Sequence, residues 1–300
     1  MVNYILKLRY RYDDTQVHVY CSLRSHRRDW AARQMYCFHP WLDGQKSTEI
    51  KQRQDACIWL GTRQQLSEAT VHSLTLSNAT VQFSDVDLGV RLDSQLTMAN
   101  HIAALSRSWF FQLRQLRSIK QSLTIEATKT LVHAFVGSWL DYCNSVLFGV
   151  SGQLLRKLQV IQNAAARIIT GTKKYERMKP VLQELHWLPV RQRITYKTAL
   201  LMYVCIHGLA PSYLAACCQP MSHCAGRSNL RSANLQQLQV PRTRTSYGDR
   251  SFLVNGPAVR NSMPVVLRSP DTSLDIFKDK LKTVLFRTVH WMRIWRICAV

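Results

Sequence analysis

Two amphipathic patterns between residues 131 and 190 constrain the fold of this chain more than any other feature. In the first, apolar side chains recur at steps of three and four residues, which places them on one helix face. These are Val132, Phe135, Val136, Trp139, Leu140, Cys143, Val146 and Leu147. The second has a narrower stripe, made of Leu154, Leu158, Ile161, Ala165 and Ile168. The run Gly149-Val-Ser-Gly152 separates the two predicted helices.

The N-terminal part has the alternating pattern of β-strands. Residues 4 to 20 alternate with a period of two around Asp13 and Asp14, which predicts a hairpin with both carboxylates in its turn. Residues 70 to 94 alternate as well, with a turn at Ser77 and Asn78. Residues 21 to 56 have poor periodicity and are expected to be poorly ordered.

After Thr97 the pattern becomes helical. Helices are predicted over residues 99 to 120, from Pro189 to Gly208, and after a cap at 271 to 273, while residues 252 to 269 are expected to be mostly turn. The fold class is therefore mainly α, a helical bundle with a small N-terminal antiparallel β-hairpin. The predicted domains are a β region at 1–96, a helical region at 97–220, a basic loop-rich linker at 221–270 and a C-terminal helix at 271–300.

Charge is the strongest signal in the composition. The chain has 40 Lys and Arg against 18 Asp and Glu, a formal net charge of +22. Residues 101 to 300 carry 28 basic and 8 acidic side chains, so most of the excess lies there. Such a positive field attracts polyanions, RNA or DNA foremost. A solvated basic surface without a ligand is the competing interpretation.

Cysteine usage and hydropathy indicate the compartment. The nine cysteines are odd in number and no secretory signal precedes them, which favours a reducing, intracellular location, nuclear or cytoplasmic. No run of 18 apolar residues predicts a membrane span. Cys217, Cys218, His223 and Cys224 form a metal-like cluster, but adjacent cysteines suit the paired spacing of zinc sites poorly, so a thiol-bearing linker is favoured.

Several long runs resemble one protein family. They include HAFVGSWLDYCNSVL (133–147), LQVIQNAAARIITG (158–171), PVLQELHWLPVRQRI (180–194), LGVRLDSQLTMANHI (88–102) and VPRTRTSYGDRSF (240–252). In this order and spacing they resemble the C-terminal part of LINE-type, jockey-like (non-LTR) retrotransposon reverse transcriptases. The resemblance implies a palm remnant, a thumb and the helical region beyond it.

The resemblance assigns roles to particular residues. Asp13 and Asp14, followed by Thr15 and Gln16, match the family's paired-aspartate motif, which implies Mg²⁺ binding and catalysis. Bulky Tyr12 occupies the place of a small residue, and the residues before Asp13 contain no further carboxylate. A two-metal site needs one from another strand, so we expect this chain alone to bind no Mg²⁺ and to be inactive as a polymerase.

The implied nucleic-acid contacts lie mainly in the helical part. Gly89 resembles the primer grip, where a residue without a Cβ permits close approach of the backbone. Basic residues of the thumb-like helices and of the later arm would contact phosphates without reading bases. They are Arg107, Arg114, Arg117, Lys120, Arg156, Lys157, Lys173, Lys174, Arg242 and Arg244.

The predicted function is therefore that of a truncated fragment of a transposable-element RNA-directed DNA polymerase. It is expected to retain non-specific binding of RNA or DNA and to have no membrane partner and no small-molecule substrate. Two alternatives stay open: a helical protein-interaction module, and a non-functional pseudogene product.

Overall fold

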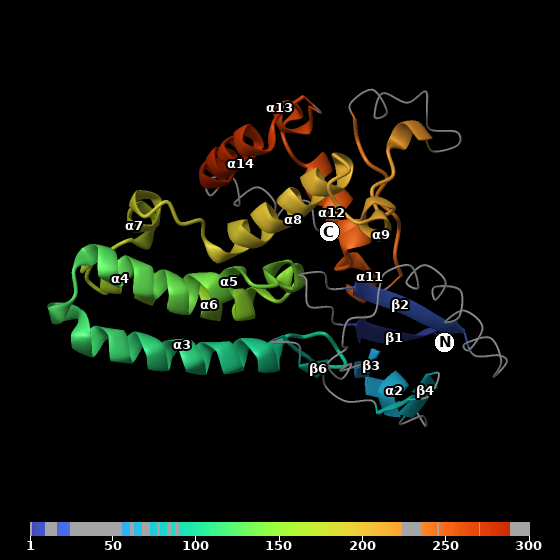
Figure 1. Ribbon diagram of the computed structural model, residues 1–300, viewed down its shortest axis with the longest axis horizontal. Coiled ribbons are helices and arrows are strands. Elements are labelled where there is room, and N and C mark those ends of the chain that lie inside the picture. The colour runs from blue at the N-terminus through green and yellow to red at the C-terminus, as the bar shows by residue number, and fades with distance from the viewer. Residues whose placement is uncertain are drawn as a thin grey trace, which may run out of the picture. The chain divides into compact units, whose positions relative to one another are not determined.

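The computed structural model describes residues 2–9, 17–24, 56–60, 63–67, 73–76, 79–82, 86–87, 90–223, 236–244, 246–269 and 271–288 (Figure 1). The chain divides into two compact units, residues 1–101 and 102–300. The mainly α fold class is confirmed, because helices account for most of the described part. The finer domain boundaries predicted from the sequence stay predictions.

The first unit contains short antiparallel sheets. Strand β1 (Val2–Arg9) pairs with β2 (Val17–Arg24) on one side and with β3 (Ala56–Leu60) on the other, which gives the order β2-β1-β3. The predicted N-terminal hairpin is therefore present. Strands β4 (Ser73–Leu76) and β5 (Ala79–Gln82) pair as predicted, with Leu76 opposite Ala79. Helix α2 (Arg63–Ser67) lies between β3 and β4 in the sequence.

A carboxylate organises the exit from the β region. Strands β6 (Val86–Asp87) and β7 (Arg91–Leu92) form the last hairpin, and Asp93 follows directly. The Asp93 Oδ1 accepts a hydrogen bond from the N–H of Met98 at 2.9 Å, and its Oδ2 accepts from the N–H and hydroxyl of Thr97 at 2.9 and 2.8 Å. These bonds satisfy donors just before helix α3 (Ala99–Ile119), the helix predicted over 99 to 120.

The second unit continues with a helix that changes its geometry. Thr124 caps α4 (Ile125–Val132) by accepting a bond from the N–H of Ala127 at 3.2 Å. A π-helical turn, η2 (His133–Gly137), then leads into α5 (Ser138–Asp141). A short 3₁₀ turn, η1 (Lys120–Ser122), precedes α4, and another, η3 (Asn144–Leu147), follows α5.

The π turn corrects part of the predicted core face. Val132, Val136 and Leu140 are buried, whereas Phe135 and Trp139 are 39% and 48% exposed. A π turn is wider than an α turn, so every fourth residue stays in line and residues at a step of three rotate outward. The prediction that Phe135 and Trp139 face the core was wrong for this reason.

Helix α6 (Gly152–Thr170) matches the second predicted pattern. Leu158, Ile161, Ala165 and Ile168 are buried, and Leu154 is half-buried. The helix ends at Gly171, whose φ of +73° is the left-handed conformation that glycine adopts at helix ends. Helix α7 (Met178–Glu184) follows and packs against α6 around Ala166, Val181 and Leu182.

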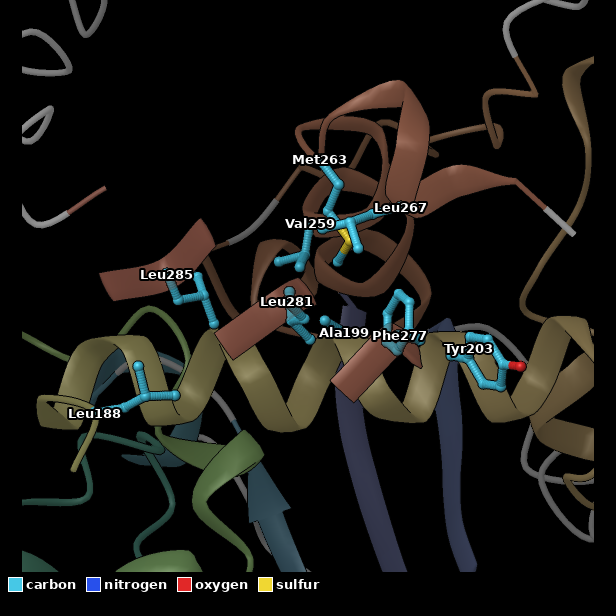
Figure 2. Close-up of a cluster of buried hydrophobic side chains, with 9 residues drawn as sticks. All are labelled: Leu188, Ala199, Tyr203, Val259, Met263, Leu267, Phe277, Leu281 and Leu285. Carbon is cyan, nitrogen blue, oxygen red and sulfur yellow. The ribbon is translucent and has the colours of Figure 1, made fainter. Parts of the chain in front are cut away.

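Helix α8 (Val190–Ile206) is central to the second unit. Two amides of α6 fix its start: Gln159 Oε1 accepts from the N–H of Val190 at 2.9 Å, and Gln162 Nε2 donates to the carbonyl of Leu188 at 2.8 Å. On its other side α8 packs against α12 (Phe252–Asn261) and α14 (Leu274–Thr288). Figure 2 shows their apolar side chains meeting in one cluster, which comprises Leu188, Ala199, Tyr203, Val259, Met263, Leu267, Phe277, Leu281 and Leu285.

The segment 252–269 was expected to be mostly turn, and that prediction was wrong. It forms α12 and α13 (Val265–Arg268), with Gly256 and Pro257 buried inside α12. Both residue types usually interrupt helices. Here Gly256 allows Met202 of α8 to approach, since a Cβ at position 256 would lie 2.5 Å from the Met202 Sδ. The remaining short helices are α9 (Ser212–Ala215), η4 (Met221–His223) and α11 (Ser246–Asp249).

Candidate nucleic-acid interface

Helix α3 presents a basic face without a single carboxylate. Its 21 residues include no Asp or Glu, and Arg107, Arg114 and Arg117 are all exposed. The helix buries Trp109, Leu113 and Leu116, which lie on the side opposite to Arg107 and Arg114 at 3.6 residues per turn. The apolar period of the sequence therefore sets the direction in which these arginines project.

Two aromatic side chains lie exposed between these arginines. Phe110 is 47% exposed and Phe111 is 64% exposed. Single exposed apolar residues are common on protein surfaces, but two adjacent aromatic rings form a patch of the kind that marks binding sites. Aromatic rings flanked by cations suit single-stranded nucleic acid, whose bases stack on the rings while its phosphates meet the charges.

Further basic side chains gather around the C-terminal end of α6. The Lys120 Nζ lies 3.8 Å from the position that a Cβ would take on Gly171. Arg167 donates from Nε to the carbonyl of Lys173 at 3.4 Å and from Nη2 to that of Lys174 at 3.2 Å, which fixes the segment that follows α6. The structure thus brings Lys120, which is distant in sequence, to the helix end that precedes Lys173 and Lys174.

An exposed tyrosine adjoins this cluster. Tyr175 is 80% exposed, and the Lys173 Nζ lies 6.0 Å from the centre of its ring. The contact is at the outer limit of a cation–π interaction. The α6 end therefore repeats, on a smaller scale, the combination of cation and aromatic ring found on α3.

The other predicted contacts are more scattered. Arg156 and Lys157 are exposed near the start of α6, where Arg156 Nε donates to the carbonyl of Gly152 at 3.3 Å. Arg242 and Arg244 are exposed in the segment before α11. Within the described part of the chain, none of the ten predicted basic residues forms an ion pair; the ion pairs there join Lys129 to Glu126, Arg193 to Asp141 and Lys278 to Asp275.

Asp13, Asp14 and Gly89 lie outside the described residues, and so do most of residues 21–56. The predicted catalytic and Mg²⁺-binding roles of the two aspartates therefore stay predictions. Cys224 is also outside this part. Among the described residues, no group of three or more His, Cys, Asp and Glu side chains could hold a metal ion.

Sequence reasoning selected the arginines and lysines from charge but missed Phe110, Phe111 and Tyr175. A signal was present, because Phe110 and Phe111 lie outside the apolar stripe that continues through Trp109 and Leu113.

Among the described helices, none is both long and apolar enough to cross a membrane.

Comparison with known proteins adds one similarity. The chain is 29% identical over 117 residues to a protein described as a probable RNA-directed DNA polymerase from transposon BS of Drosophila melanogaster. The match covers 37% of this chain and only 13% of that relative. No family model and no solved structure matches. The similarity supports a relationship between part of this chain and a transposon reverse transcriptase.

Proposed function

We propose that the chain is the C-terminal part of a LINE-type retrotransposon reverse transcriptase and that its helical unit binds RNA or DNA without sequence preference. The observation that carries the proposal is the carboxylate-free α3, with three exposed arginines and two exposed phenylalanines on one helix. The partial similarity to a transposon polymerase supports RNA or DNA as the ligand of these basic residues. Backbone contacts of this kind position a nucleic acid but do not read its sequence.

Affinity measured against salt tests the binding. Fluorescence anisotropy with a labelled single-stranded oligonucleotide would follow the dissociation constant between 50 and about 200 mM salt. Because each neutralised phosphate releases counterions, the logarithm of affinity falls linearly with the logarithm of salt concentration. We expect a steep fall and similar affinities for unrelated sequences. Affinity that does not change with salt would contradict phosphate contacts.

Polymerisation is a separate question. The proposal assigns RNA-directed DNA synthesis to the parent polymerase, and for this chain alone we expect no primer extension on an RNA template with Mg²⁺. The reason is that Arg11 and bulky Tyr12 depart from the family's motif beside Asp13 and Asp14. Incorporation of nucleotides by the purified chain, abolished by Asp13→Asn, would contradict this expectation.

A protein-interaction module is the second candidate, and the exposure of Phe110 and Phe111 favours it equally. Both candidates use the same helix face, so the ligand distinguishes them. Failure of any single-stranded oligonucleotide to bind at low salt would leave the interaction module as the better account.

A further inference from the structure

Three sulfur-containing side chains lie together on and beside α8, and none of them belongs to the basic helix faces described above. Met202 and Cys205 lie one turn apart on α8, and Cys218 follows the end of α9. The Cys218 thiol donates a hydrogen bond to the Met202 Sδ at 3.8 Å. The interaction between the Cys218 and Cys205 thiols lowers the pKa of Cys205 and raises the pKa of Cys218. Met202 is 1% exposed and Cys205 4% exposed, whereas Cys218 is half-buried, so the cluster lies at the edge of the core.

The neighbouring thiol is directed elsewhere. The Cys217 thiol donates to the carbonyl of Tyr213 at 3.5 Å, within its own turn. The Cys218 thiol also reaches the carbonyl of Leu214 at 3.7 Å, but one thiol proton can serve only one of its three acceptors at a time. The Cys218 proton is therefore shared among alternative acceptors, whereas the Cys217 thiol is directed to the Tyr213 carbonyl.

Gly256 of α12 fixes the thioether. A Cβ at this position would lie 2.5 Å from the Met202 Sδ and 3.2 Å from its Cγ, so the Met202 side chain would have to move. The absence of a side chain at Gly256 thus provides the space in which the sulfur of Met202 lies. The thioether is held against the backbone of α12 on one side and close to Cys218 on the other.

A buried cation faces the same cluster. Arg260 is 9% exposed, and within the described part of the chain its Nη1 has no hydrogen-bond partner. Its Nη2 donates to the carbonyl of Arg268 at 3.0 Å, and burial lowers the pKa of Arg260. The interaction with Cys205 and burial raise the pKa of the Cys218 thiol, and the guanidinium of Arg260 acts in the opposite direction. A buried cation without a carboxylate is costly, and an anionic group beside it would offset that cost.

We propose that Cys205, Cys218 and Met202 form a binding site for a soft monovalent metal ion, for which copper(I) is the natural candidate. Thiolate and thioether ligands select copper(I), whereas structural zinc sites take four ligands and no thioether. Binding releases the two thiol protons to solvent, forms three metal–sulfur bonds and changes no oxidation state. The complex carries one net negative charge, which the guanidinium of Arg260 balances.

The spacing between two of the three sulfur atoms agrees with this ligand set. Metal–thiolate bonds are about 2.3 Å long, so sulfur atoms at the corners of a trigonal site lie about 4 Å apart. The 3.8 Å between Cys218 Sγ and Met202 Sδ is close to that value before any metal binds. These two ligands therefore need little rearrangement to bind one ion.

The test is an anaerobic titration of the reduced full-length chain with copper(I) against a chromophoric chelator. We expect one ion per chain, with affinity reduced more than about 100-fold by Cys205→Ser or Cys218→Ser, since loss of a ligand exceeds the 10–100-fold effect of outer groups. Met202→Leu, which keeps the volume, should weaken binding by about 10-fold. Cys217→Ser is the matched control and should bind like the wild type.

Two further measurements keep the test decisive. Circular dichroism without metal establishes that each variant is folded, and X-ray absorption should show a copper ion bound by three sulfur atoms. Unchanged affinity in Cys218→Ser, or loss of binding in Cys217→Ser, would overturn the assignment. So would a Cys205–Cys218 disulfide, found by mass spectrometry in chain purified under reducing conditions. Because no oligonucleotide is involved, these results are independent of nucleic-acid binding.

Discussion

Arg193 binds Asp141 across 52 residues of sequence. Its Nη1 donates to both carboxylate oxygens at 2.8 and 2.7 Å, while its Nε donates to the carbonyl of Leu188 at 3.0 Å. The contact joins the end of α5 to the first turn of α8. One guanidinium therefore couples the helix that contains the π turn to the central helix of the second unit.

Removal of this contact should lower the free energy of unfolding by a small but measurable amount. The Asp141 side chain is 47% exposed, so solvent screens the pair, and we expect Asp141→Ala to lower the free energy of unfolding by about 1 kcal/mol. A double-mutant cycle with Arg193→Met, followed by urea unfolding, isolates the interaction. The exposed pair of Lys129 and Glu126 is the control, and an equal coupling energy there would contradict a special role for Arg193.

Gly256→Ala should destabilise the second unit by about 1–3 kcal/mol, because the added methyl group overpacks the site occupied by the Met202 sulfur. Met202→Ala in the same chain should restore part of that loss by making room. Thermal unfolding of the single and double variants measures both effects. Gly152→Ala is the control: a Cβ there would make only an ordinary contact, 3.9 Å from the Arg191 Nη2, and the substitution should be neutral or slightly stabilising. An equal loss there would exclude the packing explanation.

Arg260→Met should stabilise the metal-free protein by about 1–4 kcal/mol, because it replaces a buried charge that has no carboxylate partner by an apolar side chain of similar length. The urea midpoint of unfolding measures the gain. Arg287→Met, on the exposed side of α14, should stay within about 0.5 kcal/mol of the wild type. Destabilisation by Arg260→Met would indicate that the guanidinium has a stabilising partner.

The fold could be predicted from the sequence where the apolar residues of a helix or strand recur at one regular spacing. α6 was predicted because its stripe repeats regularly, and the β1–β2 and β4–β5 hairpins because their alternation does. The exposure of Phe135 was not predicted, because a π turn cannot be recognised in an apolar pattern that is read at 3.6 residues per turn. α12 was missed because Gly256 and Pro257 are helix breakers in isolation, and only packing against Met202 explains the glycine.

The candidate sites differ in the same way. Arg107, Arg114 and Arg117 could be selected from charge and helical spacing alone. The sulfur cluster could not, because Cys205 and Cys218 meet only through the reversal of the chain between α8 and α9. The cysteine spacing instead drew attention to Cys217, whose thiol is directed to its own turn.

The most direct test of the central claim is the salt dependence of oligonucleotide binding by a variant in which Arg107, Arg114 and Arg117 are all replaced by glutamine. Each lost phosphate contact should reduce the slope of log affinity against log salt by about 0.7 for a single strand, so the triple variant should lose about 2. Replacement of the exposed Lys179, Lys280 and Arg287 by glutamine gives a control of equal charge change. A smaller slope only in the α3 variant is the predicted result, and equal slopes for the wild type and the α3 variant would contradict a nucleic-acid interface on α3.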